Sequence, residues 1–203
     1  MGLQSQADIL FLQETHSTPD SEKIYENEYT DHTFIFSHGT SASRGVLICF
    51  KKYLELEIHT TLQDSEQGRF IVTHCTIQGK KFLLANVYAP TVETENHTFL
   101  KKINEKISLF TDSDIDFIIM EGDWNFTETL SPDRLGGNPR LWTRSVTEIN
   151  DIKDSYDLID IWRHRNPTKE EYSYYRKTER RASRIDRFYL SGSLQSSIKN
   201  TEI

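Results

Sequence analysis

The sequence lacks any apolar run of membrane-spanning length, and it has only two cysteines. A transmembrane helix needs about 20 apolar residues, and no stretch approaches that length. The N-terminus lacks the basic and hydrophobic regions of a signal peptide, and Gln6 breaks the myristoylation pattern. Cys49 and Cys75 lie inside apolar runs without metal-ligand spacing, which predicts buried thiols in a reducing compartment. We therefore expect an intracellular protein, nuclear or cytoplasmic, with no membrane segment and no small-molecule cofactor.

The composition is that of a soluble globular protein. Charged residues make up 27% and hydrophobic residues 36% of the 203 residues, which excludes a disordered chain. Aromatic residues are frequent, which favours sheet. No low-complexity linker interrupts the chain, so the sequence predicts a single domain over residues 1–203. The net charge of −7 argues against non-specific binding to polyanions, although the charge is unevenly distributed.

One stretch joins an apolar strand to two polar side chains. Residues 117–120 (Phe-Ile-Ile-Met) predict a strand buried on both faces. The chain is then expected to turn at Gly122 and to present Asp123 and Asn125 on one side of an extended backbone. A carboxylate and a carboxamide there can bind a divalent cation or a phosphate-bound water. Taken alone, the pattern also fits an ordinary turn, because Gly, Asp and Asn are common turn residues.

A second stretch repeats this design near the N-terminus. Residues 9–12 predict another doubly buried strand, which Gln13-Glu14-Thr15-His16 follows. Ligands collect at the carboxyl ends of strands in layered α/β folds, so Glu14 and Asp123 are expected to converge on one site. The alternative for Glu14 is a carboxylate of a surface loop. Tyr88, which ends a further apolar run, is either a core aromatic or a phenol that contacts phosphate.

Alternation and helical periodicity predict the remaining elements. A hairpin is expected at Gln78-Gly79-Lys80, and an amphipathic helix carries Phe99, Ile103, Ile107 and Phe110. Residues 142–162 are expected to contain helix, with residues 156–162 near its end. Further strands are predicted at residues 33–36, 44–50, 54–58, 70–77 and 81–88.

Basic residues are concentrated in one predicted hairpin, between residues 172–175 and 185–190. Arg and Tyr together suit contacts with phosphates and insertion against bases, so this hairpin is predicted to bind nucleic acid. The alternative is a solvated charged tip without a partner. The predicted nucleic-acid-binding residues are Tyr174, Tyr175, Arg176, Lys177, Arg180, Arg181 and Arg184.

Together, these features predict metal-assisted phosphodiester chemistry, with a hard oxygen ligand such as Glu14 suited to Mg²⁺. The order of the motifs resembles the endonuclease/exonuclease/phosphatase superfamily. More narrowly, it resembles the apurinic-type endonuclease domain of LINE-1-like non-LTR retrotransposons. Five segments carry the resemblance across nearly the whole chain: residues 7–16, Arg44-Gly45-Val46, Asn86-Val87-Tyr88-Ala89-Pro90, Gly122-Asp123-Trp124-Asn125 and Ser183-Arg184-Ile185-Asp186.

The resemblance implies an α/β fold, a two-sheet β-sandwich flanked by helices (DNase I-like), without its first and last strands in this sequence. It implies Glu14 as the ligand of Mg²⁺ or Mn²⁺ and Tyr88 as a phenol near the scissile phosphate. Asp123 and Asn125 would position the nucleophilic water and the phosphate, and Asp186 would orient a catalytic histidine. The hairpin of residues 172–184 would probe the DNA minor groove before one strand is nicked, leaving a 3′ hydroxyl for reverse transcription.

The sequence departs from the family pattern in two places. The family opens with a strand that carries an active-site Asn, ahead of a helix whose tail we expect at residues 2–6. It closes with a Ser-Asp-His segment, and none of the seven histidines here takes that place. In the family, the histidine of this segment is expected to bind the phosphate and to stabilise its developing charge. Loss of a group of this kind lowers the rate roughly a hundredfold or more. Because the absent strands would also leave unpaired edges and exposed apolar surface, we expect an incomplete, weakly stable domain with little or no activity.

Two other functions remain open, so catalysis itself is not settled by the sequence. The chain could be a catalytically dead remnant that binds nucleic acid through its basic hairpin. It could also be a phosphatase or phosphodiesterase of the same superfamily that acts on lipids or small molecules. The basic hairpin and the Gln-Glu-Thr-His run favour DNA as the partner over this last alternative.

Overall fold

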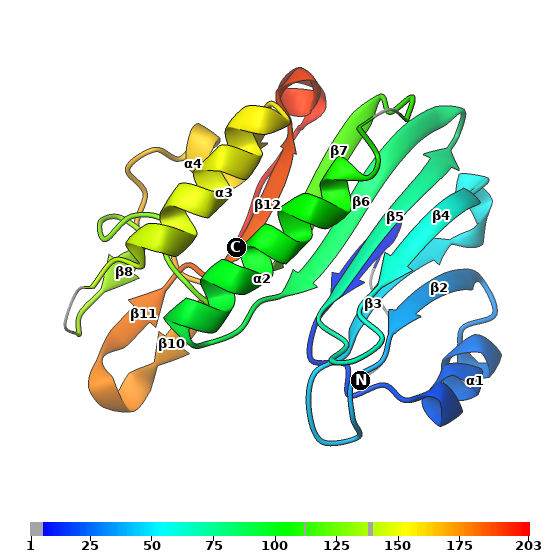
Figure 1. The fold of residues 1–203 in the computed structure, drawn as a ribbon, viewed down its shortest axis with the longest axis horizontal. Coiled ribbons are helices and arrows are strands. Elements are labelled where there is room, and N and C mark those ends of the chain that lie inside the picture. Colours follow the sequence, from blue (N-terminus) through cyan, green and yellow to red (C-terminus); the bar gives the residue numbers. More distant parts are fainter. Residues whose placement is uncertain (1–5, 112, 138–139) are drawn as a thin grey trace. The chain divides into compact units, whose positions relative to one another are not determined.

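The computed structural model describes residues 6–111, 113–137 and 140–203. Contacts divide the chain into two compact units (Figure 1). The first unit comprises Met1–Tyr88 and Asp112–Asp116, and the second comprises Ala89–Thr111 and Phe117–Ile203. The expected single domain over residues 1–203 stays a prediction. The helix tail expected at residues 2–6 lies, apart from Gln6, outside the described residues.

The first unit contains two antiparallel layers. In one layer, β3 (Val46–Lys51) lies between β1 (Ile9–Leu12) and β2 (His32–Ser37). The other layer contains β4 (Glu57–Gln63), β5 (Phe70–Ile77) and β6 (Lys80–Tyr88) in that order. β3 packs against both β5 and β6, so the two layers share a core. Helix α1 (Pro19–Glu28) packs against β2, and the short helix η1 (Lys52–Leu54) follows β3.

The core of the first unit follows from its apolar runs. All five apolar residues from Val46 to Phe50 are buried because β3 is the central strand of its layer. Gln78 and Gly79 have φ values of +48° and +75°, which is the left-handed geometry of a two-residue hairpin turn, so the hairpin prediction is confirmed. Cys49 and Cys75 are free and buried, as predicted.

Two predictions about the first unit need correction. Residues 9–12 form β1 but are half-buried, not doubly buried, because β1 pairs only with β3 within the described residues and lies at the edge of its layer. The strand predicted at residues 54–58 begins only at Glu57. Glu55 has a φ of +51°, which ends helix η1 and interrupts the extended backbone before β4.

The second unit has two sheets and three α-helices among its described residues (Figure 1). In the larger ladder, β12 (Asp186–Ser191) lies between β7 (Phe117–Asp123) and β9 (Leu158–Asp160), antiparallel to both. Helices α2 (Glu93–Ser108) and α3 (Thr143–Ser155) pack side by side, and α4 (Ile161–Arg165) contacts β9 and β12. The smaller sheet has the order β10 (Tyr174–Arg176), β11 (Arg181–Ser183), β8 (Arg134–Leu135). Two short helices also belong to the unit, η2 (Lys177–Glu179) and η3 (Gly192–Ser197).

The predicted helices are partly confirmed. Phe99, Ile103 and Ile107 line the buried face of α2, as their spacing predicts. Residues 142–162 contain α3, but residues 158–160 form strand β9 and the chain re-enters helix only at α4. The helix expected at residues 156–162 is therefore a strand followed by a short helix. Among the described residues, no helix is long and apolar enough to span a membrane.

The polar stretch after β7 also differs in detail from its prediction. β7 continues through Gly122 to Asp123, with Met120, Glu121 and Gly122 buried, so the chain does not turn at Gly122. Asn125, with a φ of +56°, marks the change of direction after the strand. Asp123 therefore ends a strand, and Asn125 lies in the turn that follows.

The basic hairpin is shorter than predicted. Its limbs are β10 and β11, with Tyr174 opposite Ser183 and Arg176 opposite Arg181. The returning limb is therefore residues 181–183, not residues 185–190, which form β12 in the other sheet. Alternation alone did not separate the two strands, because Arg184 and Ile185 join them with no Gly or Pro between.

Candidate active site

Glu14 and Tyr88 are brought together in the first unit, although 74 residues separate them in the sequence. The Tyr88 hydroxyl donates a hydrogen bond to Glu14 Oε1. Glu14 is exposed just after β1, with a φ of +51°. A left-handed backbone at a residue other than Gly carries strain, and such residues cluster at functional sites.

Side chains missed by the sequence analysis hold this pair in place. Asn86 is fully buried, and its Nδ2 donates to the backbone oxygens of Leu12 (3.1 Å) and Leu47 (2.9 Å). Its Oδ1 accepts a hydrogen bond from Gln13 Nε2 at 2.7 Å. Arg69 lies over the Tyr88 ring, 5.4 Å from its centre. Asn86 could have been selected from the sequence because it lies in the same motif as Tyr88. Arg69 lies outside the five motifs, so no sequence pattern pointed to it.

The Arg44-Gly45-Val46 motif supports the loop that carries Glu14. The backbone N–H groups of Thr15 and His16 donate to the carbonyl oxygens of Gly45 (3.1 Å) and Arg44 (2.8 Å). Gly45 has a φ of +88°, and a Cβ on it would lie 2.6 Å from Thr15 Oγ1. The motif is therefore explained by close backbone packing beneath the loop.

Asp123 and Asn125 lie together in the second unit. The Asn125 backbone N–H donates to Asp123 Oδ1 at 2.9 Å, and Asn125 Nδ2 donates to the Ala89 carbonyl at 2.8 Å. The first of these bonds is that of an Asx turn, so the turn geometry considered for this motif is present. Both side chains are partly exposed. The turn and a functional role are compatible, because a carboxylate accepts several hydrogen bonds and a carboxamide carries two donor hydrogens.

Asp186 lies beside Asp123 in the second unit, because the two residues are directly opposite in the β12–β7 ladder. The backbone N–H of Asp186 donates to Ser173 Oγ at 3.1 Å. Asp186 lines a largely apolar cavity of about 410 Å³, which Trp162 and Phe188 also line. Within the described residues, no histidine lines this cavity or bonds to Asp186.

The structure thus groups the predicted site residues in two sets. Glu14 and Tyr88 belong to the first unit, whereas Asp123, Asn125 and Asp186 belong to the second. The convergence of Glu14 with Asp123 stays a prediction. The donors of each set are hard oxygens, which suit Mg²⁺. Among the described residues, no group of three His, Cys, Asp or Glu side chains forms a metal cage. An ion held by one or two carboxylates, waters and substrate phosphate fits these residues better than a structural ion does.

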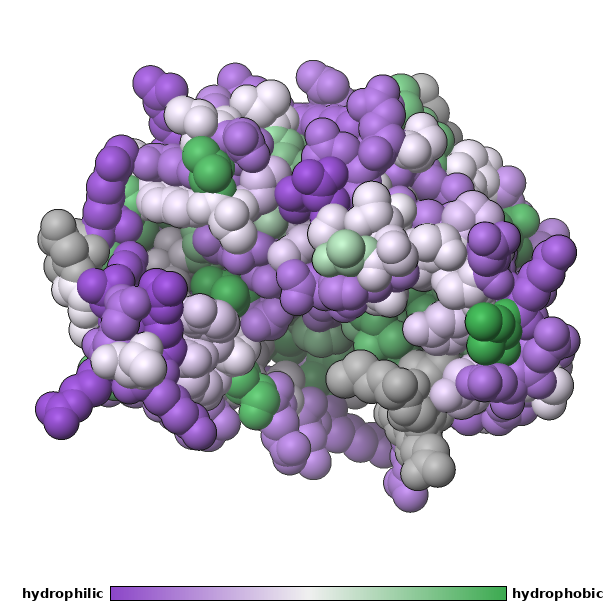
Figure 2. Space-filling view, turned by 90° about the horizontal axis from the view of Figure 1, so that it is seen from below, coloured by the Kyte–Doolittle hydropathy of each residue, from purple (hydrophilic) through white to green (hydrophobic). Residues whose placement is uncertain are grey.

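The basic hairpin presents its predicted nucleic-acid-binding residues to solvent, with one exception. Tyr174 and Tyr175 are 48% and 59% exposed. Hydrophilic side chains project from the left of Figure 2, the end at which Figure 1 shows β10 and β11. Four basic residues of the hairpin are exposed: Arg176, Lys177, Arg180 and Arg181.

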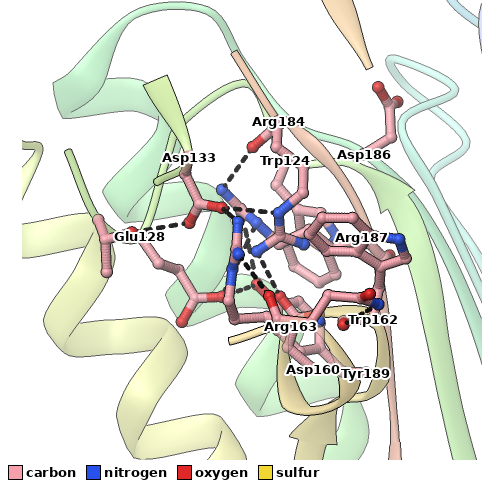
Figure 3. Close-up of polar contacts among 12 residues, drawn as sticks. Trp124, Glu128, Asp133, Asp160, Trp162, Arg163, Arg184, Asp186, Arg187 and Tyr189 are labelled. Carbon is pink, nitrogen blue, oxygen red and sulfur yellow. Dashed lines mark hydrogen bonds and ion pairs between the residues drawn. The ribbon is translucent and has the colours of Figure 1, made fainter. Parts of the chain in front are cut away.

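Arg184 is the exception, and its predicted contact with nucleic acid is not supported. It is 1% exposed and forms ion pairs with Asp133 and Asp160, both at 2.7 Å (Figure 3). A buried guanidinium with two carboxylate partners is not available to a phosphate. Its observed role is to bind Asp133 and Asp160. These acids lie far from Arg184 along the chain, so the sequence alone does not show that they pair with it.

Burial and neighbouring charges shift the pKa values of Asp133, Glu128 and Tyr189. Burial alone would raise the pKa of Asp133, but hydrogen bonds from Arg184 and Arg163 outweigh it and lower that pKa to about 2. Burial likewise opposes ionisation of Glu128, yet the Arg187 and Lys153 charges lower its pKa. Burial raises the pKa of the Tyr189 hydroxyl well above its ordinary value, and this hydroxyl donates to Glu128 Oε1 at 2.6 Å.

Comparison with known proteins identifies the family. The profile of the Endonuclease/Exonuclease/phosphatase family matches residues 3–197. The chain belongs to this family. The expected kinship with a transposon protein is also confirmed. The chain is 30% identical over 197 residues to the transposon TX1 uncharacterized 149 kDa protein of Xenopus laevis, a match that covers 96% of this chain and 14% of that protein.

Solved structures confirm the predicted α/β, DNase I-like fold for this family member. The Xenopus laevis APE2 catalytic domain superimposes with a TM-score of 0.74 at 17% identity, covering 94% of this chain and 76% of that one. A variant of the 3′ phosphatase NExo from Neisseria, bound to product DNA hairpin, gives a TM-score of 0.68 at 15% identity, covering 95% and 79%. At these identities the likeness establishes the fold alone.

Proposed function

We propose that this chain is a divalent-metal-assisted DNA endonuclease domain. The observation that supports this best is the hydrogen bond from Tyr88 to Glu14, which joins two motifs 74 residues apart at an exposed strand end. The Glu14 loop is more tightly held than an ordinary surface loop. Asn86 binds the end of β1, Arg69 lies over the Tyr88 ring, and Gly45 packs closely beneath the loop. The arrangement is that of a positioned ligand.

Glu14 is the proposed ligand of Mg²⁺ or Mn²⁺. When bound, the ion supplies positive charge to a phosphoryl oxygen and to the departing oxygen. Tyr88 orients the Glu14 carboxylate through its hydroxyl hydrogen bond. Because Mg²⁺ keeps several waters, a single carboxylate with a fixed orientation is a sufficient protein contribution.

Asp123 and Asn125 are the proposed groups for water and phosphate. Asp123 accepts one backbone hydrogen bond through Oδ1, and its carboxylate can also take the proton of an attacking water. Asn125 uses one amide hydrogen on the Ala89 carbonyl and has a second one for a phosphate oxygen. Asp186 is the proposed partner of a histidine, and no histidine bonds to it within the described residues. We therefore expect the 203-residue chain to cleave slowly, roughly a hundredfold or more below a domain with that histidine.

DNA is the proposed substrate because of the basic hairpin. Four exposed cations and two exposed tyrosines suit a phosphate backbone and its grooves. One structural neighbour, NExo, is bound to a DNA hairpin. A DNA-binding remnant without catalysis is the second candidate, favoured by the lack of a histidine partner for Asp186 among the described residues.

A plasmid-nicking assay tests this proposal. Supercoiled DNA is incubated with excess protein and Mg²⁺, and open-circle product is measured over hours. We expect slow nicking that stops with EDTA and is abolished by Glu14→Gln, because the amide is a poor ligand for Mg²⁺. Glu55→Gln is the matched control, since Glu55 is exposed in the same unit with the same φ of +51°.

The outcomes separate the candidate functions. Nicking that persists in EDTA, or that Glu14→Gln leaves intact, contradicts the assigned metal ligand. DNA binding without any nicking supports the remnant instead.

A further inference from the structure

A buried ion-pair cluster lies at the base of the basic hairpin (Figure 3). We name Asp133, Asp160, Arg163 and Arg184 the base cluster. The side chains of Asp133 and Arg184 are each 1% exposed, and those of Asp160 and Arg163 are 9% and 18% exposed. All four belong to the second unit. The proposed chemistry assigns none of these residues a role.

The cluster joins elements that are far apart in the sequence. Asp133 directly precedes β8, and Arg184 directly follows β11, so these two residues lie at the inner end of the hairpin sheet. Asp160 ends β9 and caps α4, because its Oδ1 accepts the Arg163 backbone N–H at 3.0 Å. The hairpin sheet is thereby tied to the β7–β12–β9 ladder and to α4.

The contacts leave the returning limb little freedom. Arg184 Nε donates to Asp133 Oδ1 and Arg184 Nη2 donates to Asp160 Oδ2, each at 2.7 Å. The Arg184 backbone N–H donates to the Asp133 carbonyl at 2.9 Å. Arg163 Nη2 donates to Asp133 Oδ1 at 2.6 Å, so this carboxylate oxygen accepts from both guanidinium groups. A planar guanidinium that bridges two carboxylates fixes both direction and distance.

The outgoing limb of the hairpin, β10, is connected to the same cluster through the segment that precedes it. Arg163 Nη1 donates to the carbonyls of Asn166 (2.7 Å) and Lys169 (2.9 Å), in the segment that leads to β10. Ser173 Oγ accepts the backbone N–H groups of Ile185 and Asp186, both at 3.1 Å. These last bonds join the base of the hairpin to the first residue of β12.

Burial of these charged side chains carries a desolvation penalty. Apolar residues of similar volume often serve stability as well or better, whereas a hydrogen-bonded ionic cluster specifies one geometry. The hairpin above the cluster has little apolar anchoring: of the residues of β10 and β11, Ala182 alone is buried, whereas Tyr174 and Tyr175 are 48% and 59% exposed. Its orientation therefore depends on the cluster.

We propose that the base cluster is a positioning device that holds the basic hairpin at a fixed angle to the edge formed by Asp123 and Asp186, so that bound DNA meets both. This inference rests on the proposed function for its DNA partner. Arg184 is its central positioning residue, placed directly after β11 and two residues before Asp186. The cluster acts through the exposed cations of the hairpin and does not touch DNA.

Motion of the hairpin tip is the first measurement. Thr178, exposed in η2, is replaced by Cys and labelled with a nitroxide; Cys49 and Cys75 are 1% and 0% exposed and stay unlabelled. Arg184→Lys retains the charge but cannot bridge both carboxylates, so the label should become more mobile. Arg165→Lys is the control, because Arg165 donates to the Ile198 and Lys199 carbonyls, away from the cluster. Asp160→Asn, which retains a capping side chain, serves if Arg184→Lys does not fold.

A double-mutant cycle is the second measurement. Arg184→Lys should weaken duplex DNA binding roughly fivefold, within the range of couplings between interacting residues. The same change should have no effect when Arg180→Ala and Arg181→Ala are already present, because the cluster acts only through the tip. If Arg184→Lys instead lowered the fraction of folded protein, it would weaken DNA binding to the same degree in the Arg180→Ala, Arg181→Ala variant.

Each outcome decides the inference. A more mobile tip together with a DNA effect that vanishes in the tip variant supports it. An unchanged label, or a mobile label with unchanged DNA affinity, overturns it. Failure of the wild-type chain to bind DNA at all would count against the proposed function, whereas wild-type binding that Arg184→Lys leaves unchanged counts against this inference alone.

Discussion

Glu14 and Asn125 both have left-handed backbones, with φ values of +51° and +56°. For most residues other than Gly such a conformation costs roughly 1–2 kcal/mol and persists where surrounding contacts enforce it, whereas Asn adopts it more readily. The contacts are present in both cases: Tyr88 bonds the Glu14 side chain, and the Ala89 carbonyl accepts from Asn125. The geometry alone does not mark a functional residue, because Glu55 has the same φ of +51° as Glu14.

A pair of glycines gives a prediction at this scale. Gly45 (φ +88°) and Gly79 (φ +75°) share the left-handed region, but a Cβ on Gly45 would lie 2.6 Å from Thr15 Oγ1, whereas one on Gly79 meets nothing within 4 Å. Gly79→Ala should therefore lower the free energy of unfolding by about 1–2 kcal/mol from the backbone alone. Gly45→Ala should cost more than that, because the clash adds to it. Urea denaturation of both variants measures the difference, and equal losses would contradict the packing role of Gly45.

Some residues could be assigned from the sequence and some could not. Glu14, Tyr88, Asp123 and Asn125 ended apolar runs, and strand ends are where polar groups become accessible. Arg184 was assigned to nucleic-acid binding because it lies near several other arginines. The sequence does not show which of these arginines is buried. That distinction depends on Asp133 and Asp160, which approach it only in the folded chain.

At the scale of elements, a central strand and a long amphipathic helix were predictable, whereas strand ends, helix α1 and strand β9 were not. Strand β3 and helix α2 followed directly from five consecutive apolar residues and from helical spacing. The edge position of β1 and the boundary between β11 and β12 depend on pairing partners distant in the sequence. Local patterns carry no information about such partners.

The hairpin supplies a prediction at the scale of elements. Glu179 accepts ion pairs from Arg176 (3.0 Å) and Arg181 (2.8 Å), so one carboxylate offsets the tip cations. Glu179→Gln should strengthen DNA binding and steepen its salt dependence by up to about 0.9 in the slope of log K against log salt, the contribution of one additional phosphate contact. Glu170→Gln, an exposed acid outside the hairpin strands, is the control. Unchanged or weaker binding by Glu179→Gln would show that the hairpin cations do not contact phosphate.

For the whole molecule, the net charge of −7 sets the background against which any DNA contact must act. A dispersed negative charge repels a polyanion, so binding must come from a local concentration of cations such as the hairpin tip. The fold is that of the endonuclease/exonuclease/phosphatase family, and the chain spans 14% of its transposon relative. The activity of a longer protein of that kind is a separate proposal, and for this chain the binding of metal and of DNA is what the proposed function predicts.

Binding of Mn²⁺ to the intact chain tests the central assignment most directly, because it does not depend on rapid cleavage. The electron paramagnetic resonance signal of free Mn²⁺ falls as the ion binds, and it is titrated with and without a duplex oligonucleotide. We predict binding that Glu14→Gln weakens roughly tenfold or more and that Glu55→Gln leaves unchanged. Equal Mn²⁺ affinity in wild type and Glu14→Gln would contradict the account.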